Sequence, residues 1–214
     1  MRWIIGSLAA LTLVAGCSLY NARPLPRSEL FRSPFRNTDE SVIMIVQPLD
    51  MFEDTNEYFN ADLLGEGILP FYVMILNAGD SPIRLNRSQI RLAYNGGRPL
   101  GPTPARAIAG KLASSKFGAL RMGMMGLWMA FRTDYERTSD YLKKELPLVV
   151  RIAPHEGVDG VVFFQLGQPV RDALGSKLRF RIRNEGTHED RDIALSILEF
   201  APAKTVRRPA PSRN

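Results

Sequence analysis

The stretch KLRFRIRN, residues 177–184, decides the fold class. Leu178, Phe180 and Ile182 alternate in it with three arginines. Successive side chains of a β-strand point to opposite faces of the sheet, so this alternation predicts a strand that is buried on one face and solvated on the other. Strands of this kind are typical of antiparallel sheets.

Six further stretches are rich in β-branched and aromatic residues and are bounded by turn-forming residues, which predicts six more strands. Turns such as NAGDSP and NEGTHED suit the connections between them. Seven short strands with such turns predict a mainly β protein, an antiparallel immunoglobulin-like β-sandwich, although the cysteine and tryptophan signature of antibody domains is missing. The six stretches are SVIMIVQP (41–48), LPFYVMILN (69–77), IRLNRSQIRLAY (83–94), PLVVRIA (147–153), VDGVVFFQL (158–166) and RDIALSILEF (191–200).

The segment 105–146 interrupts this pattern. It has no proline and no strand alternation, and it ends in a charged stretch that suits a helix. We therefore expect one long helix or a helical hairpin inserted in the sandwich of residues 41–200. Small residues recur in it at steps of four, interrupted once by Met122, which lets two helices approach closely. They are Gly110, Ser114, Gly118, Gly126 and Ala130.

The insertion also supplies the candidate contact surface. Three interpretations remain open for it: packing on its own sandwich, dipping into a lipid surface, or docking on a partner helix or a second copy of the chain. Methionine-rich surfaces are adaptable enough for either of the last two. The candidate residues are Gly118, Met122, Met124, Met125, Gly126 and Trp128.

The N-terminus has the three-part layout of an export signal. Arg2 precedes an apolar run over 3–14, which is too short to span a bilayer, and small residues follow up to Cys17, the only cysteine. The ending LVAGC, residues 13–17, resembles the lipobox of bacterial lipoproteins. This resemblance implies removal of residues 1–16 as a signal peptide, a covalent lipid on Cys17, and, with Ser18 next, an outer-membrane location facing the periplasm.

The regions on either side of the sandwich read as linkers. Residues 17–40 predict the lipidated cysteine followed by a flexible, proline- and arginine-containing linker, and residues 201–214 predict a disordered basic tail. The segments EYFNADLLGEGILPFYVMILNAGDSPIRL (57–85) and PLVVRIAPHEGVDGVVFFQL (147–166) resemble uncharacterised bacterial lipoproteins with an immunoglobulin-like domain. That resemblance implies a fold and carries over no functional residue.

Charge is strongly segregated along the chain, whose formal net charge is +6. Residues 37–80 contain nine acidic side chains and no lysine or arginine, and residues 81–133 contain nine basic side chains and no acid. The segregation predicts either paired charges between neighbouring strands or a basic face that steers towards an anionic surface. Export excludes nucleic acid as a partner. The partners that remain are the membrane, through the lipid anchor, and an envelope protein or a second copy of the chain.

Little in the sequence points to catalysis. His155 and His188 lie in predicted turns without metal-ligand spacing, and no nucleophile elbow is present. We expect no catalytic, metal-binding or cofactor-binding residues, and no cofactor besides the lipid on Cys17. The sequence therefore predicts a lipid-anchored cell-envelope protein that acts as a binding or assembly module. The alternative is an envelope hydrolase or carbohydrate-active enzyme that uses carboxylates of the acidic segment 50–66.

Overall fold

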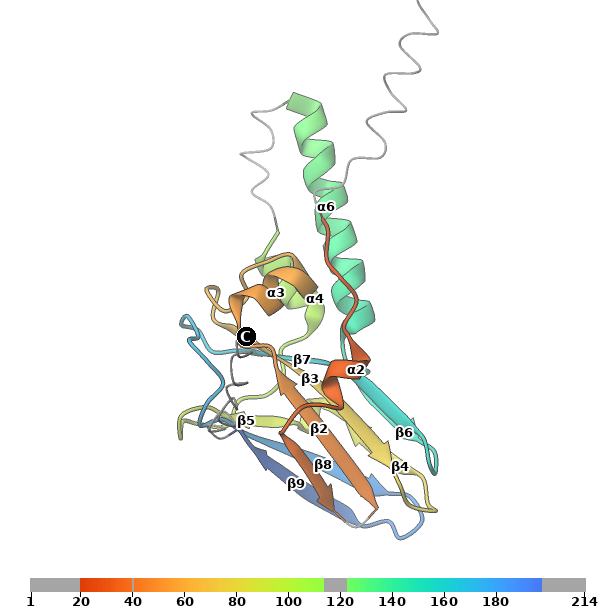
Figure 1. Cartoon of the computed structure of the whole chain (residues 1–214). Coiled ribbons are helices and arrows are strands. Elements are labelled where there is room, and N and C mark those ends of the chain that lie inside the picture. The colour runs from red at the N-terminus through yellow and green to blue at the C-terminus, as the bar shows by residue number, and fades with distance from the viewer. Residues whose placement is uncertain (1–19, 40, 114–122, 198–214) are drawn as a thin grey trace, which may run out of the picture.

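The computed structural model describes residues 20–39, 41–113 and 123–197 (Figure 1). The described chain is mainly β and contains two antiparallel sheets of four and five strands. The first sheet has the order β1–β2–β3–β7. Its strands are β1 (Arg36–Asp39), β2 (Val42–Pro48), β3 (Ile68–Asn77) and β7 (Gly157–Gln165).

In the second sheet, β8 is the central strand. It pairs with β9 on one side and with β4 and β5 on the other, and β4 also pairs with β6. The strands are β4 (Ile83–Asn86), β5 (Arg91–Ala93), β6 (Val149–Ile152), β8 (Lys177–Asn184) and β9 (Asp190–Ser196). The alternation read from 177–184 is confirmed, because Leu178, Phe180 and Ile182 are buried while the arginines between them are exposed.

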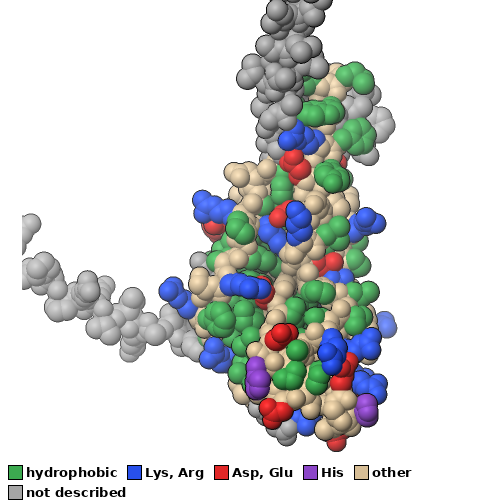
Figure 2. Space-filling model, turned by 90° about the vertical axis from the view of Figure 1, so that its right-hand side faces the viewer, with side chains coloured by type: hydrophobic (Ala, Val, Ile, Leu, Met, Phe, Trp, Pro, Cys, Tyr) green, Lys and Arg blue, Asp and Glu red, His purple; other side chains and the backbone are tan. Residues whose placement is uncertain are grey.

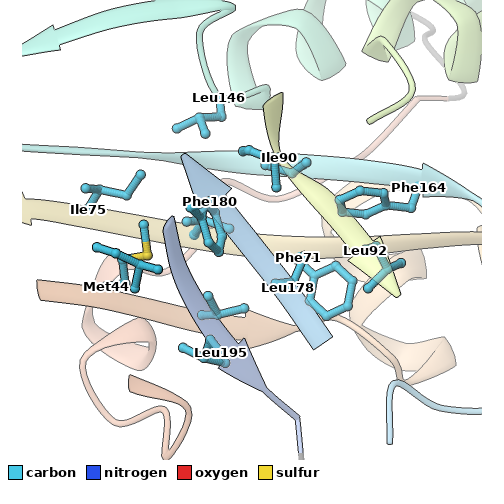
Figure 3. Packing of buried hydrophobic residues seen from close by; sticks show 14 of the residues in the cluster. Met44, Phe71, Ile75, Ile90, Leu92, Leu146, Phe164, Leu178, Phe180 and Leu195 are labelled. Atoms are coloured by element: carbon cyan, nitrogen blue, oxygen red, sulfur yellow. The ribbon is translucent and has the colours of Figure 1, made fainter. Parts of the chain in front are cut away.

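The main hydrophobic core lies between the two sheets (Figure 3). Met44, Phe71 and Phe164 enter it from the first sheet, and Phe180 and Leu195 enter it from the second. The rings of Phe71 and Phe164 meet edge to face with centroids 5.8 Å apart, a favoured arrangement for aromatic pairs.

A second hydrophobic cluster covers the outer face of the first sheet. Tyr72, Val161 and Phe163 of β3 and β7 pack there against helical residues such as Phe59 and Tyr141. Because helices cover this face, β3 is buried on both sides along almost its whole length. The helices are α2 (Arg27–Leu30), α3 (Phe52–Phe59), α4 (Ala105–Lys111) and α6 (Gly123–Lys144), and α6 projects well beyond the sheets (Figure 1).

Three expectations differ from the structure. The single strand expected over 83–94 is divided into β4 and β5 by a 3-10 turn (Arg87–Gln89), which the Asn86 side chain caps by accepting a hydrogen bond from the Ser88 N–H at 3.0 Å. The helix α3 falls in the acidic segment, where we expected no element. The insertion is helical as expected, with α4 and α6 on either side of the undescribed residues 114–122.

The third difference concerns the flexible linker expected over 17–40. Residues 20–39 of it form α2 and β1 and pack on the body. Leu30 is fully buried, and the hydroxyl of Ser33 donates to the carbonyl of Val46 at 2.5 Å. Partners distant in sequence therefore order this segment, despite a composition typical of linkers. The signal peptide, Cys17 and the basic tail lie outside the described residues.

Candidate functional site

One face of α6 packs against the body of the protein. Its buried positions recur at steps of three and four, which places them on a single helical stripe: Gly126, Ala130, Thr133, Arg137 and Tyr141. The small residues at the start of this stripe suit the close helix contact that their spacing predicts.

Polar and aromatic contacts fix the lower end of the same stripe. The Arg137 guanidinium donates to the carbonyl of Leu112, just after α4, at 2.6 Å. The Tyr141 hydroxyl donates to the carbonyl of Phe59 at 2.9 Å, and the two rings meet edge to face at 5.2 Å. The base of α6 is therefore anchored in the second hydrophobic cluster.

The opposite face of α6 is apolar and exposed. Its large side chains lie three, four or seven residues apart, so at about 100° per residue they fall on one stripe, roughly opposite the buried one. Met124 is 79% exposed and Tyr135 is 75% exposed. About half of Phe131 and nearly half of Trp128 are also exposed to solvent. We call this stripe the α6 apolar face; it comprises Met124, Trp128, Phe131, Tyr135 and Leu142.

Figure 2 shows hydrophobic side chains along the projecting upper part of the molecule. The Arg132 guanidinium lies 5.5 Å from the centre of the Trp128 ring, a cation–π geometry that leaves the ring at the surface. None of the helices in the described part of the chain is long and apolar enough to cross a membrane.

The structure separates the residues of the predicted contact surface. Met124 and Trp128 lie on the α6 apolar face, and Met125 is exposed beside it. Gly126 is buried and belongs to the stripe that faces the body. Gly118 and Met122 lie outside the described residues. The prediction therefore combined two faces of one helix, and it did not include Phe131, Tyr135 and Leu142, although their spacing is visible in the sequence.

An N-terminal strap, residues 20–30, crosses the base of α6. The Tyr20 hydroxyl donates to Asp140 Oδ2 at 2.6 Å, which fixes the start of the strap to the helix. Burial raises the pKa of Tyr20 well above its usual range, and the hydrogen bond to Asp140 raises it further. Tyr20 therefore stays protonated and remains a donor in this contact.

The rest of the strap is tied to α3 and to the first sheet. Arg23 pairs with Glu57 at 2.8 Å, and Arg27 pairs with Asp159 of β7. Asp159 Oδ2 also accepts a hydrogen bond from the Tyr72 hydroxyl at 2.8 Å. Tyr72 lies opposite Val161 in the register of β3 and β7, so Asp159 is its diagonal neighbour on the same face.

The strap, the base of α6 and the strands β3 and β7 enclose a cleft of about 400 Å³. Lys144 lies in it and donates to Asp140 Oδ2 at 2.6 Å and to the carbonyl of Tyr58 at 2.5 Å. Burial lowers the pKa of Lys144, and Asp140 opposes that shift. Because Asp140 and Asp159 are each held by two donors, they attach the strap rather than offer a free base to a substrate.

The acidic segment does not assemble a pair of free carboxylates. Asp50 accepts from the Ala173 N–H at 2.8 Å, Glu57 pairs with Arg23, and Glu66 lies 3.4 Å from Lys111. A pocket of about 150 Å³ that reaches this segment contains one of its carboxylates, Asp54. In the described ranges, no group of three or more His, Cys, Asp or Glu side chains could hold a metal ion.

The two histidines both have left-handed backbone conformations, with φ of 62° at His155 and 60° at His188. This agrees with the predicted turns. Both side chains are exposed, and His155 lies 3.6 Å from Asp80 across the end of the sandwich.

The comparisons with known proteins show distant structural likeness. No protein-family model matches the chain, and no curated protein matches it. The yjhA protein from Bacillus subtilis has 14% identity and a TM-score of 0.43 over 78% of this chain and 98% of its own. The ycdA protein of the same species, described as a candidate lipoprotein, has 11% identity and a TM-score of 0.39 over 77% of this chain and 39% of its own. A functionally unknown Listeria monocytogenes protein has 8% identity and a TM-score of 0.36, over 78% and 83%.

Proposed function

We propose that this protein is a lipid-anchored component of the cell envelope, in which an immunoglobulin-like sandwich is held at a lipid surface by its anchor and by the α6 apolar face. The anchor is the covalent lipid on Cys17, and the location is the outer membrane, facing the periplasm. We propose no catalytic step and no cofactor; of the acidic segment, Asp50, Glu57 and Glu66 are each engaged with another residue.

The observation that supports the proposal best is the hydrogen bond from Tyr20 to Asp140. Tyr20 follows Cys17 by three residues, a length of chain that spans at most about 11 Å. A lipid on Cys17 would therefore enter the membrane close to α6. Tyr20, three residues after the proposed anchor, is thus held on the helix that carries the exposed apolar face.

The length of α6 brings its apolar face to the same surface. Met124 lies about 24 Å along the helix axis from Asp140, at a rise of 1.5 Å per residue. A helix that lies along the surface, or tilts into it, would bury Met124 and Trp128 in the outer 5–10 Å or so of the lipid, the depth usual for interfacial helices. The proposed lipid on Cys17 attaches the protein, stably where it carries two or more acyl chains, and the apolar face sets the orientation of the sandwich.

The proposal is tested by the chemistry of the N-terminus and by fractionation of the cells. Mass analysis should find a lipid-modified Cys17 as the first residue, and Cys17→Ser should leave an unprocessed or released chain. The control is Ser18→Ala, which keeps the cysteine and should still fractionate with membranes. An unmodified Cys17, or cleavage at another position, would contradict the anchor.

A second candidate occupant of the α6 apolar face is another helix. The four-then-three spacing of Met124, Trp128, Phe131 and Tyr135 is the spacing of a coiled-coil seam. In that case the purified protein would form dimers through α6, or would capture an envelope protein, and it would do so without lipid. Light scattering of the protein with and without vesicles separates the two occupants.

A further inference from the structure

The outer face of the second sheet carries a row of arginines that the strand register sets side by side. Arg84 of β4 lies directly opposite Arg151 of β6 and directly opposite Arg183 of β8. Neighbouring strands are about 4.8 Å apart, so three guanidinium groups share a short row across three strands. All three side chains are on the solvent side of the sheet.

Further cations extend this row along the sheet. Arg91 of β5 lies opposite Arg179 of β8, and the exposed side chains of β8 alternate with its buried ones. We call the resulting surface the arginine face; it comprises Arg84, Arg91, Arg151, Lys177, Arg179, Arg181 and Arg183. Figure 2 shows Lys and Arg side chains gathered along the lower right of the body.

Acidic side chains neutralise only part of this surface. Arg181 pairs with Asp192 at 3.0 Å, and Arg151 pairs with Glu185 at 2.6 Å. Within the parts of the chain that the structure describes, Arg84, Arg179 and Arg183 form no close ion pair, although β9 places Asp190 opposite Arg183, and the charge of Arg179 acts on Asp192. Like charges directly opposite each other in a sheet are destabilising, so the placement of Arg84 between Arg151 and Arg183 does not favour folding.

We propose that the arginine face binds an anionic polymer that carries repeated phosphate or carboxylate groups. The planar guanidinium fork matches the oxygens of either group bidentately. Side chains two residues apart on β8 are separated by nearly 7 Å, and the strands are about 4.8 Å apart, so the face offers several anchoring points at once. An extended polyanion that crosses β6, β4 and β8 would relieve the repulsion between the arginines.

The position of the face favours a polymer over the membrane that holds the anchor. The strand β6 follows the base of α6 and runs away from the projecting helix (Figure 1), and Arg151 is the third of its four residues. That this polymer belongs to the cell envelope rests on the proposed export of the protein. The arginine face itself is independent of that proposal.

The test measures binding of the full chain, purified in detergent from the cell fraction that holds it, to immobilised long-chain polyphosphate and polygalacturonate. The test variant is Arg84→Gln, Arg179→Gln, Arg183→Gln. The matched control, Arg32→Gln, Arg106→Gln, Arg171→Gln, removes the same charge from exposed arginines outside the strands of this sheet. Vesicles that contain phosphatidylglycerol form a separate arm.

The unmodified protein should bind at least one polymer, with an affinity that falls roughly 20- to 40-fold between about 50 and 200 mM salt through the three free arginines alone. The test variant should lower the slope of log affinity against log salt by about 2 to 3 and should bind more weakly than the control. Its melting temperature should change little, because all three side chains are exposed, and the loss of repulsion at Arg84 offsets the loss of attraction between Arg183 and Asp190.

Three results would overturn the inference. They are polymer binding that the test variant leaves unchanged, an equal loss of binding in the control, and a loss confined to the vesicles, which would make the face a membrane contact. Failure of the anchor proposal would appear elsewhere, in the mass of the N-terminus. The two proposals can therefore fail separately.

Discussion

Replacing Met124 and Trp128 with serine should release α6 from the lipid surface without unfolding the protein. Met124 is 79% exposed and Trp128 is 45% exposed, so most of the methionine and nearly half of the tryptophan can be buried against a partner. Burial of a whole methionine side chain contributes about 1.5–3 kcal/mol to the binding free energy, so burial of the exposed part of Met124 contributes about 1.2–2.4 kcal/mol. The exposed part of the tryptophan, roughly 70–110 Å², adds about 2–3 kcal/mol.

The double substitution should therefore weaken vesicle binding by about 3–5 kcal/mol as an upper limit, which is a loss of roughly a hundred-fold or more. The assay uses residues 17–214 with Cys17→Ser, so that no acyl chain masks the contribution of α6. Trp128 is then the only tryptophan, because the other one is Trp3. Its fluorescence should shift to the blue when vesicles are added, and co-sedimentation gives the affinity of each variant.

The matched control is Phe31→Ser with Leu148→Ser, which removes two exposed apolar side chains away from α6. Exposed substitutions usually change the free energy of unfolding by less than about 0.5 kcal/mol each, so both variants should melt near the parent. Equal vesicle binding by the Met124 and Trp128 variant and its parent would refute the reasoning. A marked fall in the melting temperature would show that these side chains stabilise the protein itself.

Three further predictions concern stability. Arg87→Leu should destabilise the protein by about 3–5 kcal/mol in a denaturant titration, because it leaves Glu145, 2.8 Å away and 10% exposed, buried without its cation; a loss below about 1 kcal/mol would contradict this role. Gly126→Leu should lower stability by about 1–3 kcal/mol, since it overpacks the stripe that faces the body, and an unchanged melting temperature would place Gly126 at a free surface. Burial raises the pKa of Tyr72 and Tyr141 above the usual 10.0, so the folded state keeps these protons after the unfolded chain loses them. Above about pH 10, the free energy of unfolding should therefore fall by about 1.4 kcal/mol per pH unit for each tyrosine. A melting temperature that stays constant as the pH rises through this range would contradict the shifts.

Sequence patterns predicted those parts of the fold that depend on differences in polarity between neighbouring residues. The alternation around Phe180 predicted both the strand and its buried face, because each residue differs from its neighbours in polarity. The same alternation placed three arginines on the solvent side. It could not show that Arg84 lies between Arg151 and Arg183, since this depends on the register of three strands that are far apart in the chain.

The N-terminal strap shows why composition alone misled. Proline and arginine are typical of linkers, yet the partners of Tyr20 and Arg27 are Asp140 and Asp159, 120 and 132 residues further along the chain. A local pattern contains no information about such partners. The pair Asp140 and Lys144 was visible in the sequence at helical spacing, but the way its carboxylate holds the strap was not.

Two surfaces of this protein are not explained by folding alone. Exposed side chains such as Met124 and Trp128 contribute little to the stability of α6 in water, and Gly126 inside the helix costs about 1 kcal/mol relative to alanine. The arginine face likewise sets like charges against one another. Consistency between sequence and fold is expected to fail at functional sites, where a partner supplies the missing interaction. The partner proposed for the apolar helix face is a lipid or another apolar surface, and the partner proposed for the cationic sheet is an anion, so the two proposed partners differ in chemistry and can be bound at the same time.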